Sequence, residues 1–445
     1  MASKIQTLPG FRDFPPEACA LRNFIFRKWR QTAVSFGFQE YDGPVLEPLE
    51  LFTEKSGPEI VTQLFNFVDK GDRAVSLRPE LTPTLARMVG ANAGSVKRPV
   101  KWFAVAECFR FEKQQKGRKR SFYQFNADIL GEAGPGADAE LIALCIESLR
   151  SFGLGPEHFV VRLSDRTLWM GFLAGMGLDE AASIKVLGIV DKMERVAMDY
   201  TREQLTPVFG ARLDEFLGHV QKMHAIASME ELEAWVASLA MPALTERMAQ
   251  WRELWAILSG MGLTEFCRVD LGIVRGLAYY TGFVFEVFER SGEGRAVAGG
   301  GRYDKLVEKL GYQPMHASGF AVGDVTLADL LESAKLLPSL LHTVDCFVVM
   351  GEGEAERKAG LAAVASLRHL GVTADYAIKP TGFGKQFKMA DGAHAKLTLI
   401  FGGDEVAQGQ FKMRDMATGG EAMGNIAELV DGVQMRLSHG IEAGV

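Results

Sequence analysis

The chain has 445 residues, of which 47% are hydrophobic and 24% charged, and its formal net charge is −7. Such a composition is typical of a globular protein with enough residues for two or three hydrophobic cores. It excludes a protein that coats nucleic acid through bulk positive charge, although it is compatible with a local basic groove. No apolar run is long enough to span a bilayer, and residues 1–17 lack the apolar stretch of a signal peptide.

The five cysteines are widely spaced and form no CxxC pair. This spacing argues against a disulfide framework and against a zinc site. We therefore expect a protein of the reducing cytoplasm, with no metal site built by protein side chains alone. The cysteines are Cys19, Cys108, Cys145, Cys267 and Cys346.

The first predicted element is a helix over residues 17–37, because apolar side chains recur there at three- and four-residue steps. Gly37 is a plausible C-terminal cap for this helix. Residues 38–48 are then extended, and Pro44 and Pro48 interrupt them. Such a segment suits an edge strand or a contact between subunits.

A hairpin is predicted over residues 66–77, with its turn at 69–72. It leads to a helix that Thr82 and Pro83 could start, with threonine as the capping residue and proline at the first helical position. For Thr82 considered alone, this capping role is the preferred interpretation.

Two runs with strand character, residues 101–112 and 121–130, flank a loop rich in lysine and arginine, which predicts a hairpin with a cationic tip. Side chains of a strand alternate between two faces, so Gln124, Asn126 and Asp128 share one face of the second run. The pattern is typical of a half-solvated antiparallel sheet. It fits equally well the floor of a pocket with an anion clamp above it, and the stretch alone leaves both possibilities open.

Helical periodicity dominates the next part of the chain. A helix is predicted over residues 137–152, and residues 165–262 are almost entirely helical in pattern, which indicates a helical insertion whose methionines fill its core. Strand character returns over residues 267–290. The glycines at 299–301 allow either a close approach of the backbone to another group or a sharp bulge.

A linker is predicted near residues 331–342, and the pattern then changes to short apolar strands alternating with helices. The predicted strands cover residues 344–351, 372–378 and 395–402. Uniformly apolar strands between helices indicate a small α/β domain with a buried sheet.

Taken together, these pieces resemble the class II histidyl-tRNA synthetases over essentially the whole chain and in the order of that family. The first class II motif resembles Phe36 to Pro48, and the second resembles Phe109 to Asp128. Two segments particular to the family resemble Arg275 to Gly282 and Gly299 to Asp304, and residues 385–405 resemble part of its anticodon-binding domain.

The resemblance implies an α+β fold, in which an antiparallel sheet flanked by helices forms the catalytic domain. That domain is discontinuous, and the implied boundaries are 1–164 and 263–333 for the catalytic domain, 165–262 for the helical insertion, 334–342 for the linker and 343–445 for a C-terminal α/β anticodon-binding domain. The implied activity is activation of histidine with ATP and Mg²⁺, followed by transfer of histidine to its tRNA. The family also implies a homodimer with the first motif at its interface.

The implied chemistry requires positioning and charge neutralisation rather than a base, because a carboxylate attacks the α-phosphorus of ATP. Arginine suits this task, since its guanidinium holds phosphate oxygens through paired hydrogen bonds. The residues that match catalytic positions are Arg110 and Arg275, and those that match ATP-binding positions are Arg110, Glu112, Arg118, Arg120 and Phe122. Histidine-binding positions match Glu80, Thr82, Gln124, Asp128, Arg275, Tyr279, Tyr280 and Tyr303, and Gln115 and Lys116 match positions near the acceptor end of the tRNA.

The sequence departs from the family pattern in the third class II motif, which usually ends in Glu-Arg and here has Val325 and Thr326. Threonine cannot hold the terminal phosphate of ATP as arginine does, so Arg118, Arg120 or Arg302 covers this phosphate or activation is weakened. Two further departures are Ala278, where the family more often has Asp, and Asp128, where a longer Glu is common.

These departures support an alternative, a catalytically silent histidine-binding paralogue of the kind that regulates ATP phosphoribosyltransferase. Such regulators generally lack the anticodon-binding domain and tend to lose the paired arginines of the phosphate site. The chain has that domain and retains Arg110 and Arg275, so we favour the synthetase.

Overall fold

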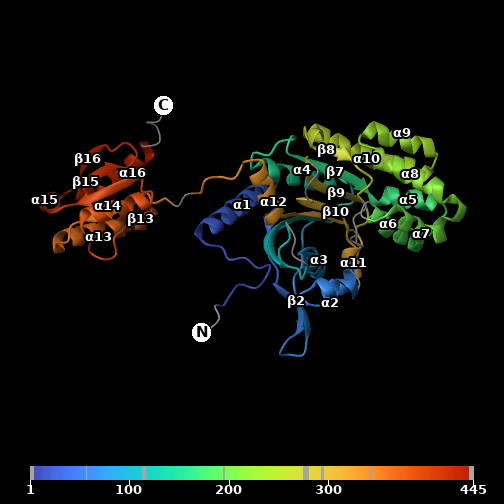
Figure 1. Cartoon of the computed structure of the whole chain (residues 1–445), viewed down its shortest axis with the longest axis horizontal. Coiled ribbons are helices and arrows are strands. Elements are labelled where there is room, and N and C mark those ends of the chain that lie inside the picture. The colour runs from blue at the N-terminus through green and yellow to red at the C-terminus, as the bar shows by residue number, and fades with distance from the viewer. Residues whose placement is uncertain are drawn as a thin grey trace. The chain divides into compact units, whose positions relative to one another are not determined.

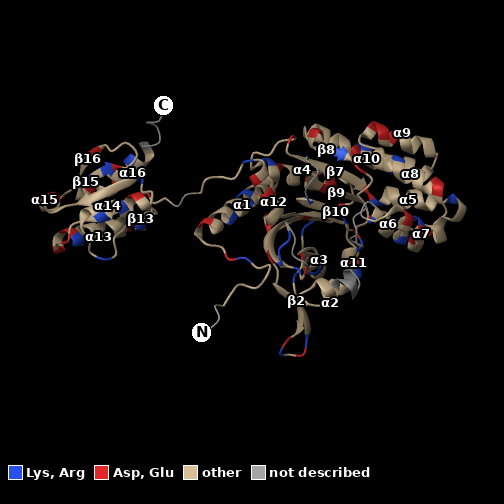
Figure 2. Ribbon diagram, in the orientation of Figure 1, with Lys and Arg blue, Asp and Glu red and all other residues tan. Residues whose placement is uncertain are grey.

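A computed structural model describes residues 5–56, 58–112, 117–193, 196–273, 280–291, 295–340 and 343–439. The chain forms two compact units, Met1–Pro338 and Ser339–Val445, each with its own core (Figure 1). Figure 2 shows acidic and basic residues interspersed on the helices of both units. Within the described ranges, no helix is long and apolar enough to cross a membrane.

The larger unit is organised around a sheet in which eight strands are described, in the order β1-β5-β6-β11-β10-β9-β7-β8. The pairs at the two edges, β1 with β5 and β7 with β8, are parallel, and the pairs between them are antiparallel. The strands are β1 (Gln39–Glu40), β5 (Val100–Phe109), β6 (Ser121–Leu130), β7 (Phe159–Asp165), β8 (Cys267–Val269), β9 (Phe283–Glu289), β10 (Ala298–Arg302) and β11 (Ala317–Gly323). The predicted hairpin of residues 101–130 is confirmed as β5 and β6, although β5 ends at Phe109.

Helices cover one face of this sheet, namely α1 (Pro16–Ser35), α4 (Pro135–Arg150) and α12 (Asp324–Ser333). The alternation in β6 matches this arrangement, because Phe125 and Ala127 are fully buried in the core beneath the helices. Gln124 and Asn126 therefore face the opposite side of the sheet, as predicted. Gly37 follows α1 with a φ of +77°, a conformation that glycine adopts at little cost, which confirms it at the helix end.

A smaller three-stranded sheet contains the end of the first motif, as β2, and the predicted hairpin of residues 66–77, which is confirmed. Thr82 is the first residue of α3 (Thr82–Ala91), and no side-chain hydrogen bond caps this helix. The capping role predicted for Thr82 is therefore wrong, and its hydroxyl is left for another contact. The remaining elements here are β2 (Leu46–Pro48), β3 (Asn66–Val68), β4 (Ala74–Leu77), α2 (Glu50–Ser56), the 3-10 helix η1 (Pro58–Gln63) and α11 (Leu306–Lys309).

Helices alone fill the described chain between β7 and β8 apart from connecting turns, which confirms that the insertion is helical. Asp165, the last residue of β7, accepts hydrogen bonds from Arg247 at 2.6 Å and from Trp251 at 2.9 Å, so a buried carboxylate ties the insertion to the sheet. The methionines Met223 and Met248 are buried, as predicted, but Met198 and Met261 are 49% and 46% exposed, so the prediction that the methionines fill the core is confirmed only in part. The elements are α5 (Arg166–Gly175), α6 (Glu180–Val190), α7 (Met198–Phe209), η3 (Gly210–Arg212), α8 (Leu213–Ala225), α9 (Met229–Leu239), α10 (Pro242–Gly260) and η4 (Thr264–Phe266).

The glycines of β10 lie in an unbroken ladder with both neighbouring strands, so a bulge is ruled out there. A Cβ on Gly300 would lie 2.3 Å from the carbonyl oxygen of Gly319, and one on Gly301 would lie 2.6 Å from that of Phe283. Close packing of neighbouring backbones therefore requires these glycines.

The smaller unit is a five-stranded sheet in the order β13-β12-β14-β15-β16, with a parallel core and an antiparallel edge. All five residues of β12 are buried, which confirms the predicted α/β fold with a buried sheet. The elements are β12 (Cys346–Met350), α13 (Glu354–His369), β13 (Ala374–Tyr376), α14 (Phe383–Gly392), β14 (Leu397–Phe401), α15 (Gly403–Ala407), β15 (Gln410–Asp415), β16 (Glu421–Asn425), η5 (Ile426–Glu428) and α16 (Leu429–His439).

Candidate active site

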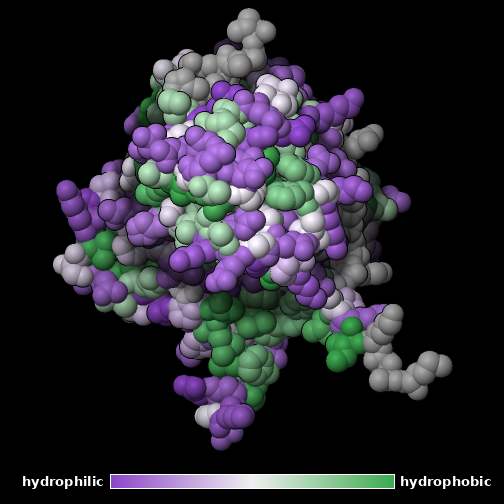
Figure 3. All heavy atoms as spheres, turned by 90° about the vertical axis from the view of Figure 1, so that its left-hand side faces the viewer, coloured by the Kyte–Doolittle hydropathy of each residue, from purple (hydrophilic) through white to green (hydrophobic). Residues whose placement is uncertain are grey.

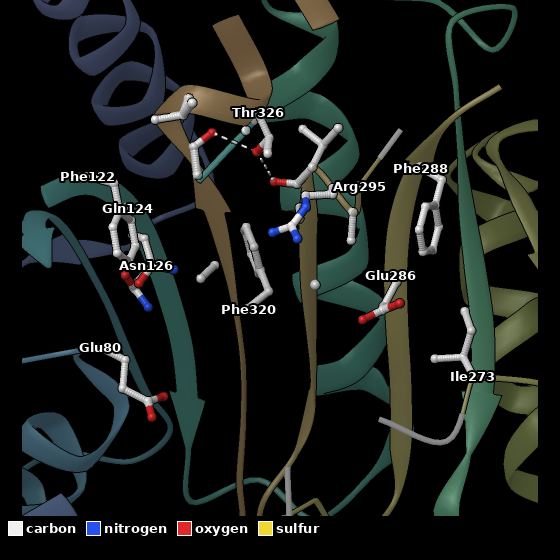
Figure 4. A pocket seen from close by; sticks show the side chains of 18 of the residues that line it. Glu80, Phe122, Gln124, Asn126, Ile273, Glu286, Phe288, Arg295, Phe320 and Thr326 are labelled. Carbon is white, nitrogen blue, oxygen red and sulfur yellow. Dashed lines mark hydrogen bonds between the residues drawn. The ribbon is translucent and has the colours of Figure 1, made fainter. Parts of the chain in front are cut away.

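A cavity of about 930 Å³ lies over the face of the large sheet that the helices leave uncovered (Figure 4). Its floor is formed by β6, β11, β10 and β9, and the chain at the start of α3 adds Glu80 and Thr82. Most of the described residues predicted to bind ATP or histidine line it, namely Glu80, Thr82, Arg110, Glu112, Arg118, Phe122, Gln124, Tyr280 and Tyr303. The polar face of β6 is therefore a cavity floor rather than a solvated surface.

A buried hydrogen bond joins Tyr303, which lines one end of this cavity, to Asp128, a predicted histidine-binding residue that does not itself line it. The hydroxyl of Tyr303 donates to Oδ1 of Asp128 at 2.6 Å, and each residue is only 1% exposed. Asp128 lies on β6 opposite Gly319 of β11, and Gly319 itself lines the cavity. The Tyr303 hydroxyl thus reaches the cavity with a buried carboxyl as its partner, and it adds a hydrogen-bonding group to walls that already carry polar side chains.

Gln124 lines the same part of the cavity and is oriented from the neighbouring strand. The thiol of Cys108 on β5 lies 3.6 Å from Oε1 of Gln124 and can donate to it. Burial raises the pKa of Cys108 to about 12, so the sulfur keeps its proton near neutral pH. Because Oε1 is occupied in this way, the amide nitrogen of Gln124 is left to donate to a ligand.

Arginines and an aromatic ring form another part of the wall. The guanidinium of Arg110 lies 5.2 Å from the ring centre of Phe122, and its Nε donates to the carbonyl of Pro79 at 3.1 Å. Arg118 forms an ion pair with Glu112 at 2.8 Å. These four predicted residues are brought together, so that two cations and one flat ring border the same space, which suits a nucleotide.

Arg120, also predicted to bind ATP, does not line this cavity. Its guanidinium lies 4.3 Å from the ring centre of Phe111, and its Nη1 lies 3.4 Å from the carbonyl oxygen of Pro9. The backbone N–H of Arg120 donates to Gly10 at 2.9 Å. The side chain thus contacts the segment ahead of α1, and an ATP contact for it stays a prediction.

Asp324 lies in the cavity wall at the start of α12 and connects that wall to the N-terminal segment. It accepts hydrogen bonds from Arg12 at 2.7 Å and from the backbone of Tyr123 at 2.9 Å. Burial raises the pKa of Asp324, although the nearby charge of Arg12 acts in the opposite direction. Two segments far apart in the sequence are therefore held together at the rim.

The suggestion that Arg302 holds a terminal phosphate is wrong. Arg302 is 6% exposed, and its guanidinium donates to Asp138 at 2.5 and 3.1 Å, to Asp304 at 3.4 Å and to the carbonyls of Glu132 and Gly134. These contacts use all of its N–H groups. Arg302 therefore stabilises the junction of β10 with α4 and is directed away from the cavity.

Thr326 lines the cavity, and its hydroxyl donates to the carbonyl of Val297 or Gly323, each at 3.3 Å. Several predicted residues lie outside the described residues, namely Gln115, Lys116, Arg275 and Tyr279, as does Ala278.

Sequence reasoning missed several polar residues of the cavity. Asn126 could have been included, because it lies on the polar face of β6 between Gln124 and Asp128. Glu286 had a signal too, since it is a carboxylate in the middle of the otherwise apolar run of residues 283–288 in strand β9. Arg295, and the ion pair of Arg162 with Asp270 at 3.5 Å, had none. No group of three or more potential metal-ligating His, Cys, Asp or Glu side chains occurs in the described part of the chain.

Comparisons with known proteins identify the family of the chain. The family model described as "Histidyl-tRNA synthetase" matches residues 10–326, and the one described as "Anticodon binding domain" matches residues 345–436. The chain belongs to the histidyl-tRNA synthetase family. The resemblance inferred from the five sequence motifs is thus confirmed, together with the presence of an anticodon-binding domain.

Relatives of this family cover nearly the whole chain. A histidine--tRNA ligase of Opitutus terrae is 53% identical over 416 residues, which are 93% of this chain and 94% of that protein. The chloroplastic/mitochondrial histidine--tRNA ligase of Arabidopsis thaliana is 34% identical and covers 94% of this chain, with 85% of its own length matched. The compartment therefore differs among histidyl-tRNA synthetases related to this chain.

Solved structures share the fold. The histidyl-tRNA synthetase of Nostoc sp. PCC 7120 superimposes with a TM-score of 0.79 at 22% identity, covering 98% of this chain and all of that one. A Bacillus halodurans C protein titled as an ATP phosphoribosyltransferase regulatory subunit/histidyl-tRNA synthetase gives a TM-score of 0.72 at 22% identity, covering 91% of this chain and all of that one. At this identity the likeness concerns the fold alone.

Proposed function

We propose that this chain is a histidine--tRNA ligase, which forms histidyl-adenylate and pyrophosphate from histidine and ATP and then transfers histidine to the 3′ end of its tRNA. The observation that carries this proposal is one cavity with two unlike parts. One part has Tyr303, whose hydroxyl bonds to the buried Asp128, and the other has Arg110, Arg118 and Phe122. The first suits an imidazole and the second a nucleotide phosphate and base.

In the first step, an oxygen of the histidine carboxylate bonds to the α-phosphorus of ATP, and the bond from that phosphorus to the pyrophosphate oxygen breaks. No proton is removed, so the protein acts by alignment and by neutralising negative charge. Arg110 would hold the α-phosphate, and Phe122 would lie against adenine. Arg275 is proposed as a second cation by family resemblance.

The imidazole ring requires one hydrogen-bond donor and one acceptor from its pocket when neutral. Asp128 supplies an acceptor, the hydroxyl of Tyr303 can accept while it donates to Asp128, and the hydroxyl of Tyr280 can do either. Glu80, Thr82 and Gln124 would hold the amine and carboxylate of the amino acid. The free hydroxyl of Thr82, which does not cap α3, supports this role. Apolar analogues would leave these buried groups unpaired and would be rejected.

Mg²⁺ would enter with ATP, because this ion keeps several waters and is held mainly by phosphates with one or two carboxylates. Glu286 lines the cavity and offers such a carboxylate. The tRNA would contact Gln115 and Lys116 with its acceptor end and the C-terminal unit with its anticodon. All five cysteines are free thiols, which supports the expected reducing cytoplasm.

A homodimer is proposed through the first motif and the hairpin of β3 and β4, which lies in the same small sheet as β2. Val45, Leu46, Phe67 and Val68 are 40–65% exposed on the small sheet. Figure 3 shows apolar surface on the projection at the lower edge of the molecule, which Figure 1 assigns to the hairpin of β3 and β4. Apolar side chains grouped in this way favour a protein contact. Replacing Phe67 and Val68 with Asp should give monomers by analytical ultracentrifugation, and an unchanged mass would refute this interface.

The test of the activity is histidine-dependent exchange of labelled pyrophosphate into ATP, followed by charging of histidine tRNA. We expect Arg110→Ala to reduce exchange by about a hundredfold or more, as losses of transition-state charge stabilisation do. Arg252→Ala is the control, because Arg252 is an exposed residue of the helical insertion that pairs with Glu233 on the surface. Histidine binding without exchange or charging by the unmodified protein would favour the regulatory paralogue instead.

A further inference from the structure

The cavity has a gap in positive charge where the third class II motif usually places an arginine. Thr326 occupies that position at the start of α12, and its hydroxyl bonds to backbone carbonyls. Two of the three arginines suggested as substitutes do not line the cavity, since Arg302 is paired with Asp138 and Arg120 lies against the ring of Phe111. Terminal phosphates of ATP carry most of its negative charge, so a cation is expected near this position.

Arg295 lines the cavity beside Thr326 although it comes from a different part of the chain. Figure 4 shows its guanidinium directed into the cavity from the segment ahead of β10, close to Thr326 and toward Phe320 of β11. A Cβ built on Gly117 would lie 3.6 Å from Cδ of Arg295 and 3.7 Å from Cγ2 of Thr326. Arg295, Thr326 and the end of the second-motif loop therefore meet at one place.

Backbone contacts hold Arg295 in register with the start of α12. Val297, two residues later, donates its N–H to Val287 of β9 at 2.8 Å. The carbonyl of Val297 accepts from the N–H of Gly323 at 3.2 Å and from the hydroxyl of Thr326 at 3.3 Å. Thr326, which stands where the family usually has arginine, thus helps to fix the segment that carries Arg295.

We propose that Arg295 holds the terminal phosphates of ATP and the departing pyrophosphate, in place of the arginine absent at Thr326. This inference rests on the proposed histidine--tRNA ligase activity and identifies the phosphate-binding residue of the same site. A planar guanidinium can bind two phosphate oxygens at once, which a threonine hydroxyl cannot do. Arg118 lies on the same wall, but it is paired with Glu112, so its positive charge would be shared between Glu112 and the phosphates.

The decisive measurement compares ATP with AMP, because AMP lacks the terminal phosphates. In calorimetric titrations, Arg295→Ala should weaken ATP binding about tenfold or more and leave AMP binding within about twofold of the unmodified protein. The matched control is Arg268→Ala, an exposed arginine of β8 that does not line the cavity. Equal loss of both nucleotides, or no loss of either, would overturn the inference.

A variant that moves the arginine from position 295 to position 326 provides the second test. Recovery of ATP binding in this variant would show that the loss in Arg295→Ala does not come from a folding defect. Introducing Thr326→Arg into Arg295→Ala should restore most of the lost ATP affinity. It should also return the Michaelis constant for pyrophosphate in the exchange reaction toward that of the unmodified protein. Failure to restore either quantity would count against the proposal. Failure of the proposed function appears separately: the unmodified protein would then show no histidine-dependent exchange, whereas the comparison of ATP with AMP would still read out Arg295.

Discussion

Asp128 and Gly319 lie opposite each other on β6 and β11, and a Cβ on Gly319 would lie 1.8 Å from Oδ1 of Asp128. The carboxylate therefore occupies the space that any other residue at position 319 would fill. In that space it also meets the hydroxyl of Tyr303. The absence of one side chain thus determines where the buried carboxyl of Asp128 lies.

Gly319→Ala should displace the Asp128 carboxylate and so weaken histidine binding. We expect the Michaelis constant for histidine to rise about tenfold or more, with a loss of unfolding free energy of about 1–3 kcal/mol from overpacking. Exchange kinetics and urea unfolding measure the two effects. Gly94→Ala is the control, because a Cβ at Gly94 meets nothing within 4 Å. An unchanged histidine constant would contradict the assigned pocket.

Tyr303→Phe removes a buried hydroxyl while preserving the ring. A hydrogen bond to a charged group contributes about 1.5–3 kcal/mol, so we expect histidine affinity to fall by roughly tenfold or more. ATP affinity should stay constant, since the hydroxyl lies at the other part of the cavity. Isothermal titration with each substrate separates the outcomes. An equal decrease for both would instead indicate a general distortion of β10.

Cys108→Ala removes the thiol that orients Gln124. A thiol is a weak donor, so the expected effect is a rise of about twofold to threefold in the histidine Michaelis constant. Because burial raises the pKa of Cys108 to about 12, we also expect this thiol to resist alkylation at pH 8 in the folded protein. Mass spectrometry after iodoacetamide treatment reads this out, and rapid labelling of Cys108 would disprove its burial.

Arg302→Leu should act on stability rather than on ATP. Removing one partner of the buried pair with Asp138 leaves an uncompensated carboxylate, which costs about 3–5 kcal/mol. Urea unfolding of the variant, and of the double variant Arg302→Leu/Asp138→Leu, tests this. The double variant should recover part of the loss. If Arg302→Leu instead kept its stability and lost ATP affinity, the arginine would have a phosphate role after all.

Asp345 makes the smaller unit sensitive to acid. It accepts hydrogen bonds from Thr373 at 2.6 and 3.0 Å and from Lys396 at 2.7 Å. Partial burial raises the pKa of the Asp345 carboxyl, but the bonds from Lys396 and Thr373 outweigh it and leave the pKa below the ordinary value of 3.8. A lowered native pKa means that the stabilisation is complete above 3.8 and is lost as the pH falls through the native pKa.

Asp345→Asn should therefore reduce local stability by about 1 kcal/mol at pH 7, and its difference from the unmodified protein should shrink as the pH falls below about 4. Hydrogen exchange of peptides covering β12 and β13 in the full chain measures this. Asp375→Asn, an exposed aspartate of β13, is the control. A difference that persists in acid would contradict a role for the ionised carboxyl.

Local patterns predicted much of this fold and part of the candidate site. Alternation in β6 placed Gln124 and Asp128 on one face correctly, because a strand fixes the side of each residue. The role of Thr82 was predicted wrongly, because the preference of threonine for helix caps is a local property and carries no information about a cavity beside the helix. Arg295 and Thr326 meet only through strand register and the contacts of Val297, and no local pattern encodes a meeting of that kind.

The contacts of Gly10 and Arg12 bear on how the protein should be produced. These residues precede α1 and bond to Arg120 and Asp324, at the nucleotide side of the cavity. A deletion through Arg12, or proteolytic clipping there during purification, would leave the hydrophobic cores whole and yet loosen the wall that faces ATP. Preparations should therefore have their N-terminal residues checked by intact mass before a low activity is attributed to the enzyme itself.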